Sequence, residues 1–332
     1  MRLGRCMLIG LLAAVMATTA AAQEVTEQEV RQVLDSPQVQ HQVSVLAKLY
    51  DASDFTTLES QLQAFSGLEQ EAVRTGLVTY AVESGALDQA KADWLQRQAE
   101  RTPAYQVVEQ GDGYLVTQSA FHYGAKAKSL VRKWQHIQLA AAMVKQAEAG
   151  ELVLSEWMAG ELASQTVRRD IFLEQLPNLS AQAVAKLAAQ FTSDSKLLWL
   201  PDNAVIAALA AASRDNSVYH LLWRRRSDQF SLAELNRLAE LAPATHAIEQ
   251  LKAATINPSL KRQAYRALIT QHPIPVSARD FLAAKLDEVE DGELVAIELA
   301  RMGYLDWLRQ LAEVSRSKVM QNNFRAAVAQ QP

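Results

Sequence analysis

The chain has 332 residues, 49% of them hydrophobic, and a formal net charge of −4. This length can bury a large core, as one elongated domain or two compact ones. The mild acidity argues against general nucleic-acid binding, which usually needs a strong basic excess. The single cysteine, Cys6, lies near the N-terminus in a segment that we expect to be removed. We therefore expect no disulfide, thiol nucleophile or cysteine metal site in the mature protein.

Residues 1–22 have the features of a secretory signal peptide. Arg2 and Arg5 precede a short apolar run, and three alanines ending at Ala22 provide a cleavage pattern. The run is too short for a comfortable membrane span, and no later run is long enough. We predict cleavage before Gln23 and a periplasmic location in a Gram-negative-type cell. An uncleaved N-terminal anchor is the alternative.

Residues 23–102 predict an N-terminal helical bundle. Thr26 and Glu29 fit a capping box, and Ser36 followed by Pro37 fits a helix start. Apolar residues then recur three or four positions apart throughout the segment. We predict four or five helices here, in up-and-down order because the connections are short.

Residues 103–123 predict a β-hairpin connector. Two β-prone runs, 105–110 and 114–118, flank the glycine-rich turn 111–113. A two-stranded ribbon alone is marginally stable, so it must pack on helices or pair with a partner. Two interpretations stay open: a structural connection between two helical regions, or an exposed edge that adds a strand from another chain.

A long helix is predicted over residues 124–149. One face carries the basic side chains Lys128 and Arg132, four residues apart, with Lys133 adjacent. Like charges at this spacing repel each other weakly. The basic stripe therefore faces solvent, meets acids from elsewhere in the fold, or binds an anionic partner.

A second candidate binding group closes a later helix. Tyr219 and Trp223 lie along one face of that helix, which ends in Arg224, Arg225 and Arg226. Cations in a last turn complement the helix dipole, which is a purely structural explanation. The functional alternative is an aromatic and arginine patch that binds a carboxylate or phosphate group.

The remaining segment, residues 124–329, predicts a helical-repeat region. From Phe230 onward, short amphipathic segments begin near Phe230, Pro243, Asn257, Pro275, Asp291 and Tyr304. Alternate starts are 27 to 34 residues apart, about the length of a helical hairpin, and single hairpins stack because they cannot cover their own apolar faces.

This segment resembles HEAT-like α-solenoids, with a shorter and irregular period. The resemblance implies stacked helical hairpins and a long binding surface. The predicted fold class is all-α, an irregular helical-hairpin solenoid with one small β-hairpin insertion. An irregular helical globule is the alternative. One further helix is predicted after Tyr304, ending at Ala329.

Motifs for catalysis and metal binding are scarce. The chain lacks the signatures of serine hydrolases, zinc proteases, P-loop enzymes and dinucleotide-binding enzymes. Ser-x-x-Lys matches at 193–196 and 315–318 lack companion motifs, and the histidines show no close metal-ligand spacing. Residues 287–292 with Glu298 partly match an EF-hand loop, but Val289 occupies a ligand position. We predict no catalytic residue, no metal and no cofactor.

The leading hypothesis is a non-enzymatic periplasmic scaffold that binds an envelope protein or peptide and no nucleic acid. One alternative is an enzyme, or enzyme accessory, that acts on cell-wall or glycan material. Glu109, Asp112 and the acids of 287–291 would then supply a pair of carboxylates. The other alternative is a binder of an anionic envelope ligand through the two basic groups.

Overall fold

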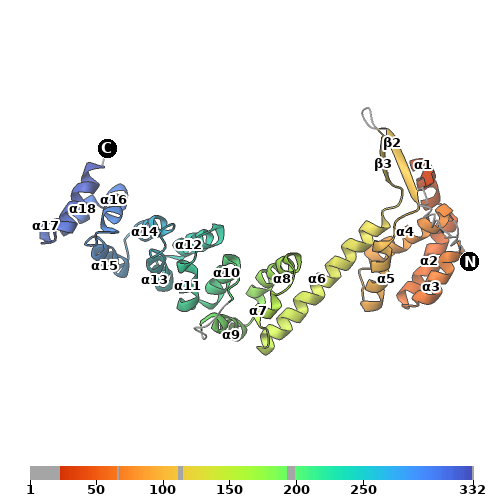
Figure 1. Ribbon diagram of the computed structural model, residues 1–332, viewed down its shortest axis with the longest axis horizontal. Helices are drawn as coiled ribbons and strands as arrows, with labels where there is room; N and C mark the ends of the chain where they lie inside the picture. Colours follow the sequence, from red (N-terminus) through yellow and green to blue (C-terminus); the bar gives the residue numbers. More distant parts are fainter. Residues whose placement is uncertain (1–22, 66, 111–114, 193–198, 331–332) are drawn as a thin grey trace, which may run out of the picture. The chain divides into compact units, whose positions relative to one another are not determined.

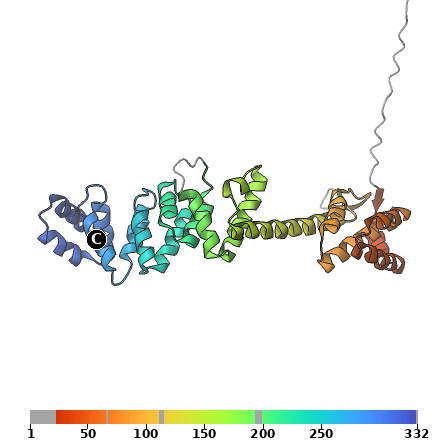
Figure 2. The same cartoon turned by 90° about the horizontal axis from the view of Figure 1, so that it is seen from below.

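The computed structural model describes residues 23–65, 67–110, 115–192 and 199–330. The predicted signal peptide, the turn at 111–113 and the match at 193–196 lie outside these ranges. The described chain is helical apart from one small sheet, as predicted. It forms two compact units, one ending at Ile137 and one beginning at Gln138. The division falls within helix α6 (Tyr123–Ala149), shown in Figures 1 and 2.

The first unit begins with five helices, α1 to α5. Its helices before the hairpin are α1 (Glu27–Leu34), α2 (Pro37–Asp51), α3 (Phe55–Ala64), α4 (Gly67–Ser84) and α5 (Gln89–Glu100). Thr26 and Glu29 form a reciprocal capping box on α1, and the Ser36 side chain accepts from the Val39 N–H at the start of α2. Local capping chemistry therefore fixes where the first two helices begin.

A three-stranded sheet completes the first unit. Strand β2 (Tyr105–Gln110) pairs antiparallel with β3 (Leu115–Ser119), which confirms the predicted hairpin. Its other edge pairs in parallel with β1 (Gln23–Val25), a segment predicted to be helical. Tyr105 and Val107 are buried in the same core as the N-terminal helices. The hairpin thus packs as part of the first unit, and β3 is left as an edge of the sheet.

The second unit consists of helices from the end of α6 onward. They are α7 (Leu154–Trp157), α8 (Leu162–Gln175), a 3₁₀ turn (Leu176–Asn178), α9 (Ala181–Thr192), α10 (Asn203–Ser213), α11 (Asn216–Arg224), α12 (Gln229–Leu241), α13 (Thr245–Ala254), α14 (Lys261–Ile269), α15 (Val276–Lys285), α16 (Gly292–Arg301), α17 (Leu305–Val314) and α18 (Lys318–Ala329). The prediction of a single helix after Tyr304 is wrong, because two helices, α17 and α18, follow this residue. The Ser317 side chain accepts from the Met320 N–H and starts a second helix, because serine favours an N-cap over a helix interior.

These helices stack in two layers. Each even-numbered helix from α8 to α18 contacts the next even-numbered one, and α9, α11, α13 and α15 form a second row in the same way (Figure 1). One continuous apolar core runs between the rows. The helical-hairpin stack predicted from the spacing of segment starts is therefore present. Among the described helices, none is long and apolar enough to cross a membrane.

Candidate functional site

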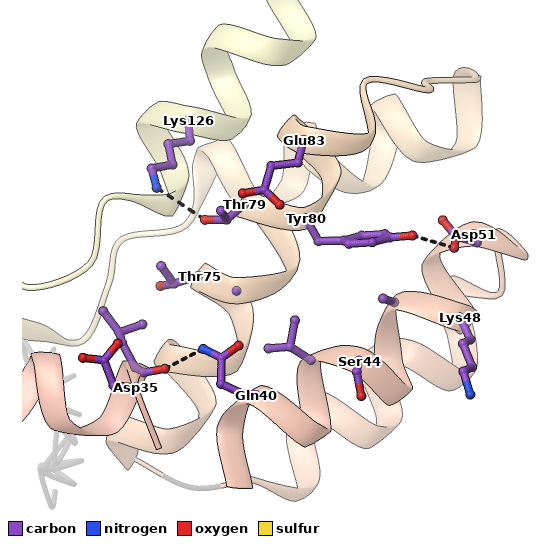
Figure 3. A pocket seen from close by; sticks show the side chains of 14 residues that line it. Asp35, Gln40, Ser44, Lys48, Asp51, Thr75, Thr79, Tyr80, Glu83 and Lys126 are labelled. Atoms are coloured by element: carbon purple, nitrogen blue, oxygen red, sulfur yellow. Dashed lines mark hydrogen bonds between the residues drawn. The ribbon is translucent and has the colours of Figure 1, made fainter. Parts of the chain in front are cut away.

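An open groove of about 610 Å³ lies in the first unit, between α2 and α4 and beside the start of α6. Figure 3 shows its lining from close by. The lining residues are Leu34, Asp35, Gln40, Val43, Ser44, Ala47, Lys48, Asp51, Thr75, Gly76, Thr79, Tyr80, Glu83 and Lys126. Most of them carry polar side chains, so the groove is suited to a polar ligand.

Small side chains create the hollow. Gly76 lies inside α4, where a Cβ atom would overlap Cγ2 of Val43 on α2. The two helices therefore cross closely at this point, and Gly76 is required for the close approach. Ser44 and Ala47 also line the α2 side, and their short side chains leave open space above the crossing.

Several polar side chains of the groove are held in place. Tyr80 Oη donates to Asp51 Oδ2 at 2.7 Å, and Gln40 Nε2 donates to the Leu34 carbonyl at 2.8 Å. Lys126 Nζ donates to Thr79 Oγ1 at 3.3 Å (Figure 3). The hydrogen bond to Asp51 raises the pKa of Tyr80, so this phenol stays protonated as a donor.

Other charged groups of the groove remain available. The side chains of Lys48, Asp35 and Glu83 are exposed or partly exposed, and they have no polar partner within the described part of the chain. A lysine amine can act as a general base that takes the proton of a hydroxyl nucleophile. Lys126 does not have that role toward Thr79 here, because its exposed ammonium group donates the hydrogen bond to the hydroxyl. The arrangement can bind donors, acceptors and charges of both signs.

The predicted aromatic surface on α11 is wrong. Tyr219 and Trp223 are fully buried, with their rings stacked 5.8 Å apart. Tyr219 Oη donates to the buried Glu234 carboxylate at 2.5 Å. These rings pack into the core because α11 contacts α9 and α13 on either side within its layer.

Two asparagine side chains hold the backbone of the arginine turn at 224–226. Asn203 Nδ2 donates to the Arg226 carbonyl, and Asn257 Nδ2 donates to the Arg225 carbonyl, both at 2.9 Å. Arg225 Nε donates to Asn203 Oδ1 at 2.7 Å, so this guanidinium is partly used for packing. Arg224 and Arg226 are exposed. Two of the three predicted arginines therefore remain available on a fixed turn.

The basic stripe on α6 is exposed. Lys128, Arg132 and Lys133 all reach solvent, and none of them has an ion-pair partner among the described residues. They lie in the first unit, whereas the arginine turn lies in the second. Neither unit by itself brings the two predicted basic groups together.

Asp291, in the acidic cluster before α16, makes contacts to the neighbouring helix α14. Asp291 Oδ1 accepts from Lys261 Nζ at 2.5 Å, and Oδ2 accepts from Tyr265 Oη at 2.6 Å. Burial opposes ionisation of Asp291, but the hydrogen bonds from Lys261 and Tyr265 prevail and lower its pKa. Glu298, the last position of the EF-hand match, is paired with arginines. Among the described residues, no group of three acids or histidines could hold a metal ion.

Asp112 and the Glu109 side chain lie outside the described part of the chain. Sequence reasoning also missed the groove between α2 and α4. The one local signal for it was Gly76 inside an otherwise regular helical pattern, which indicates close packing of another element.

No family model matches the chain, and neither the curated proteins nor the solved structures contain a significant match.

Proposed function

We propose that this protein is a non-enzymatic, HEAT-like scaffold of the periplasm, and that its α2–α4 groove binds an extended peptide segment of an envelope protein. The groove itself carries this proposal. It combines fixed hydrogen-bonding side chains with the available charges of Lys48, Asp35 and Glu83. An extended peptide offers alternating N–H and C=O groups and charged side chains to such a surface.

Two physical features favour binding over a role in packing alone. Tyr80, Gln40 and Lys126 are already held by internal hydrogen bonds, so less side-chain entropy is lost when a ligand binds. The stacked hairpins of the second unit add the kind of extended surface on which repeat proteins bind their partners.

Filling the groove should weaken peptide binding. Ser44 is exposed on the α2 side of the groove, and we expect Ser44→Trp to weaken binding at least about tenfold, or about 1.4 kcal/mol. The probes are labelled peptides selected on the wild-type protein from a displayed random library. Their affinity is measured by fluorescence anisotropy.

The matched control is Val45→Trp. Val45 is the next residue of α2, is exposed and does not line the groove. The Val45→Trp variant should bind the selected peptides with the affinity of the wild type. Equal affinity of the two tryptophan variants for these peptides would contradict a role for the groove.

Export is part of this proposal, with cleavage between Ala22 and Gln23. The Gln23 nitrogen begins β1 and donates to the Ala104 carbonyl at 2.9 Å. Cleavage would turn this amide into an ammonium group, which is also a donor and strengthens a hydrogen bond to a carbonyl. We expect intact-mass spectrometry of protein released by osmotic shock to give a chain that starts at Gln23. A mass that retains residues 1–22 would refute the cleavage.

A further inference from the structure

A buried carboxylate in the second unit is surrounded by three arginines. Glu298 on α16 has a side chain only 2% exposed. Arg262 Nη1 donates to Glu298 Oε1 at 2.8 Å. Arg266, one turn later on α14, donates from Nε to Oε2 at 2.6 Å and from Nη2 to Oε1 at 3.2 Å. Arg301, the last residue of α16, is 3.5 Å from Oε1.

This cluster carries more positive charge than the buried carboxylate needs. One bidentate arginine already satisfies a carboxylate well, and Arg266 has that geometry. Among the described residues, Glu298 is the only acid within ion-pair distance of the three arginines. Of the three arginines, Arg266 and Arg301 lie in the last turns of α14 and α16, where the helix dipoles offset part of this charge. An excess of positive charge remains.

The unused hydrogen-bond donors face solvent. Each guanidinium has five N–H donors, and the Glu298 contacts use only a few of them. The side chains of Arg262, Arg266 and Arg301 remain 54%, 48% and 47% exposed. Because the buried carboxylate already positions these groups, an incoming anion meets donors that are largely preorganised.

An aromatic stack lies just beyond the C-terminal ends of the same two helices. His272 follows α14 and Tyr304 follows α16, and their rings stack with centroids 5.5 Å apart. Tyr304 Oη and His272 Nδ1 are 2.6 Å apart, which holds the stack together. His272 is exposed and Tyr304 is partly exposed. Tyrosine and arginine are among the residue types that are enriched at the binding hot spots of protein interfaces.

We propose that Arg262, Arg266 and Arg301 form a binding site for the carboxylate side chains of an acidic peptide segment. The site is separate from the α2–α4 groove and adds a second contact to the proposed scaffold. Arg266 and Glu298 already show a carboxylate held bidentately at this position. The chain is net negative, at −4. An extended polyanionic surface, such as an anionic membrane or a nucleic acid, would be repelled by the chain as a whole. A short acidic peptide meets only the local cluster.

The test uses the full mature chain and a fluorescently labelled hexaglutamate peptide with blocked ends. A hexaglutamine peptide of the same length is the uncharged control. We expect anisotropy to show binding of hexaglutamate alone, with an affinity that falls as salt rises because the contact is electrostatic. Equal binding of the two peptides would overturn the proposal.

Arg301→Gln identifies the site. Arg301 makes the longest contact to Glu298, so its loss disturbs the buried carboxylate least. We expect affinity for hexaglutamate to fall about three- to tenfold. Arg309→Gln is the matched control, because Arg309 is a similarly exposed arginine on α17, 2.9 Å from Asp306. Glu298→Gln, which keeps the shape and removes the negative charge, should bind hexaglutamate more tightly than the wild type.

Each of three results would contradict the assignment of the binding site to these arginines. The first is equal affinity of Arg301→Gln and Arg309→Gln. The second is loss of hexaglutamate binding in Ser44→Trp, which would place the peptide in the α2–α4 groove. The third is Arg301-dependent binding to anionic phospholipid vesicles that is tighter than binding to the peptide. If Ser44→Trp still bound the library peptides, the groove proposal would fail, but Arg301-dependent binding of hexaglutamate would still support the arginine site. The two proposals can therefore fail independently.

Discussion

We expect Arg74→Leu to lower the free energy of unfolding by about 3–5 kcal/mol, because it leaves a partly buried carboxylate without its counter-ion. The Arg74 side chain, on α4, is 1% exposed. It donates to both oxygens of Glu59, at 3.2 and 3.0 Å, and to Gln98 Oε1 at 2.7 Å. Its removal therefore breaks contacts to two other helices, α3 and α5.

Glu59 is the centre of this buried network. It also accepts from Trp94 Nε1 at 2.8 Å and from Gln98 Nε2 at 3.2 Å. Burial opposes its ionisation, but the hydrogen bonds and charge of Arg74 prevail and lower its pKa. A carboxyl group with a lowered folded-state pKa stabilises the fold above its unfolded pKa, and this contribution is lost as pH falls through the folded pKa. The difference between Arg74→Leu and the wild type should therefore shrink in acid.

Urea unfolding followed by circular dichroism measures this effect. Arg97→Leu on α5 is the control, because Arg97 is exposed, and it should change stability by at most about 0.5 kcal/mol. The double variant Glu59→Gln with Arg74→Leu should recover part of the loss, since no charge is then left unpaired. Arg74→Leu as stable as Arg97→Leu would show that the network does not stabilise the unit.

Features set by neighbours in the sequence were predictable. The capping box of Thr26 with Glu29, the N-cap at Ser36 and the hairpin at 105–118 each depend on residues a few positions apart. The starts of α13, α14, α15 and α17 likewise follow breaks at Pro243, Pro258, Pro275 and Gly303. The stacking of hairpins could be inferred because the apolar stripes are too wide for one hairpin to cover.

Features set by distant partners were not predictable. Strand β1 exists because it pairs with β2, about eighty residues later, and its own sequence has no strand pattern. The α11 aromatics pointed to a surface patch only because sequence shows one apolar face, whereas a stacked helix is covered on several sides. Lys261, which pairs with Asp291, and Arg262 and Arg266, which pair with Glu298, come from α14, about thirty residues earlier in the sequence.

The candidate sites follow the same division. The arginines of 224–226 could be recognised as a group, but not the two asparagines that fix their turn. The α2–α4 groove joins side chains from α2, α4 and α6, and each of them alone is an ordinary polar residue on a helix. Charge in a helical sequence does not reveal burial, which is why Arg74 could not be identified as a core residue.

Gly292 marks the start of a helix, as glycine in a sequence often marks an element boundary, but the reason for glycine at this position is close packing. Its sequence pattern indicates a turn, but the structure places it as the first residue of α16, buried and without a positive φ. A Cβ atom there would lie 2.7 Å from the Leu286 carbonyl oxygen and would overlap Asn323 Nδ2. Those two atoms form a hydrogen bond of 2.9 Å between the end of α15 and α18. Glycine is needed for close approach rather than for backbone freedom.

Gly292→Ala should therefore destabilise the second unit by about 2–4 kcal/mol, through overpacking and the loss of a buried hydrogen bond. Gly124→Ala on α6 is the matched control: its Cβ would meet nothing closer than 3.5 Å, so stability should stay equal or rise by at most about 1 kcal/mol. Urea unfolding measures both, and hydrogen exchange should show the loss at α15, α16 and α18. If Gly292→Ala matched Gly124→Ala, the close contact would not limit this position. Adding Asn323→Ala to Gly292→Ala separates the causes, because it relieves the overlap with the amide but cannot restore the hydrogen bond.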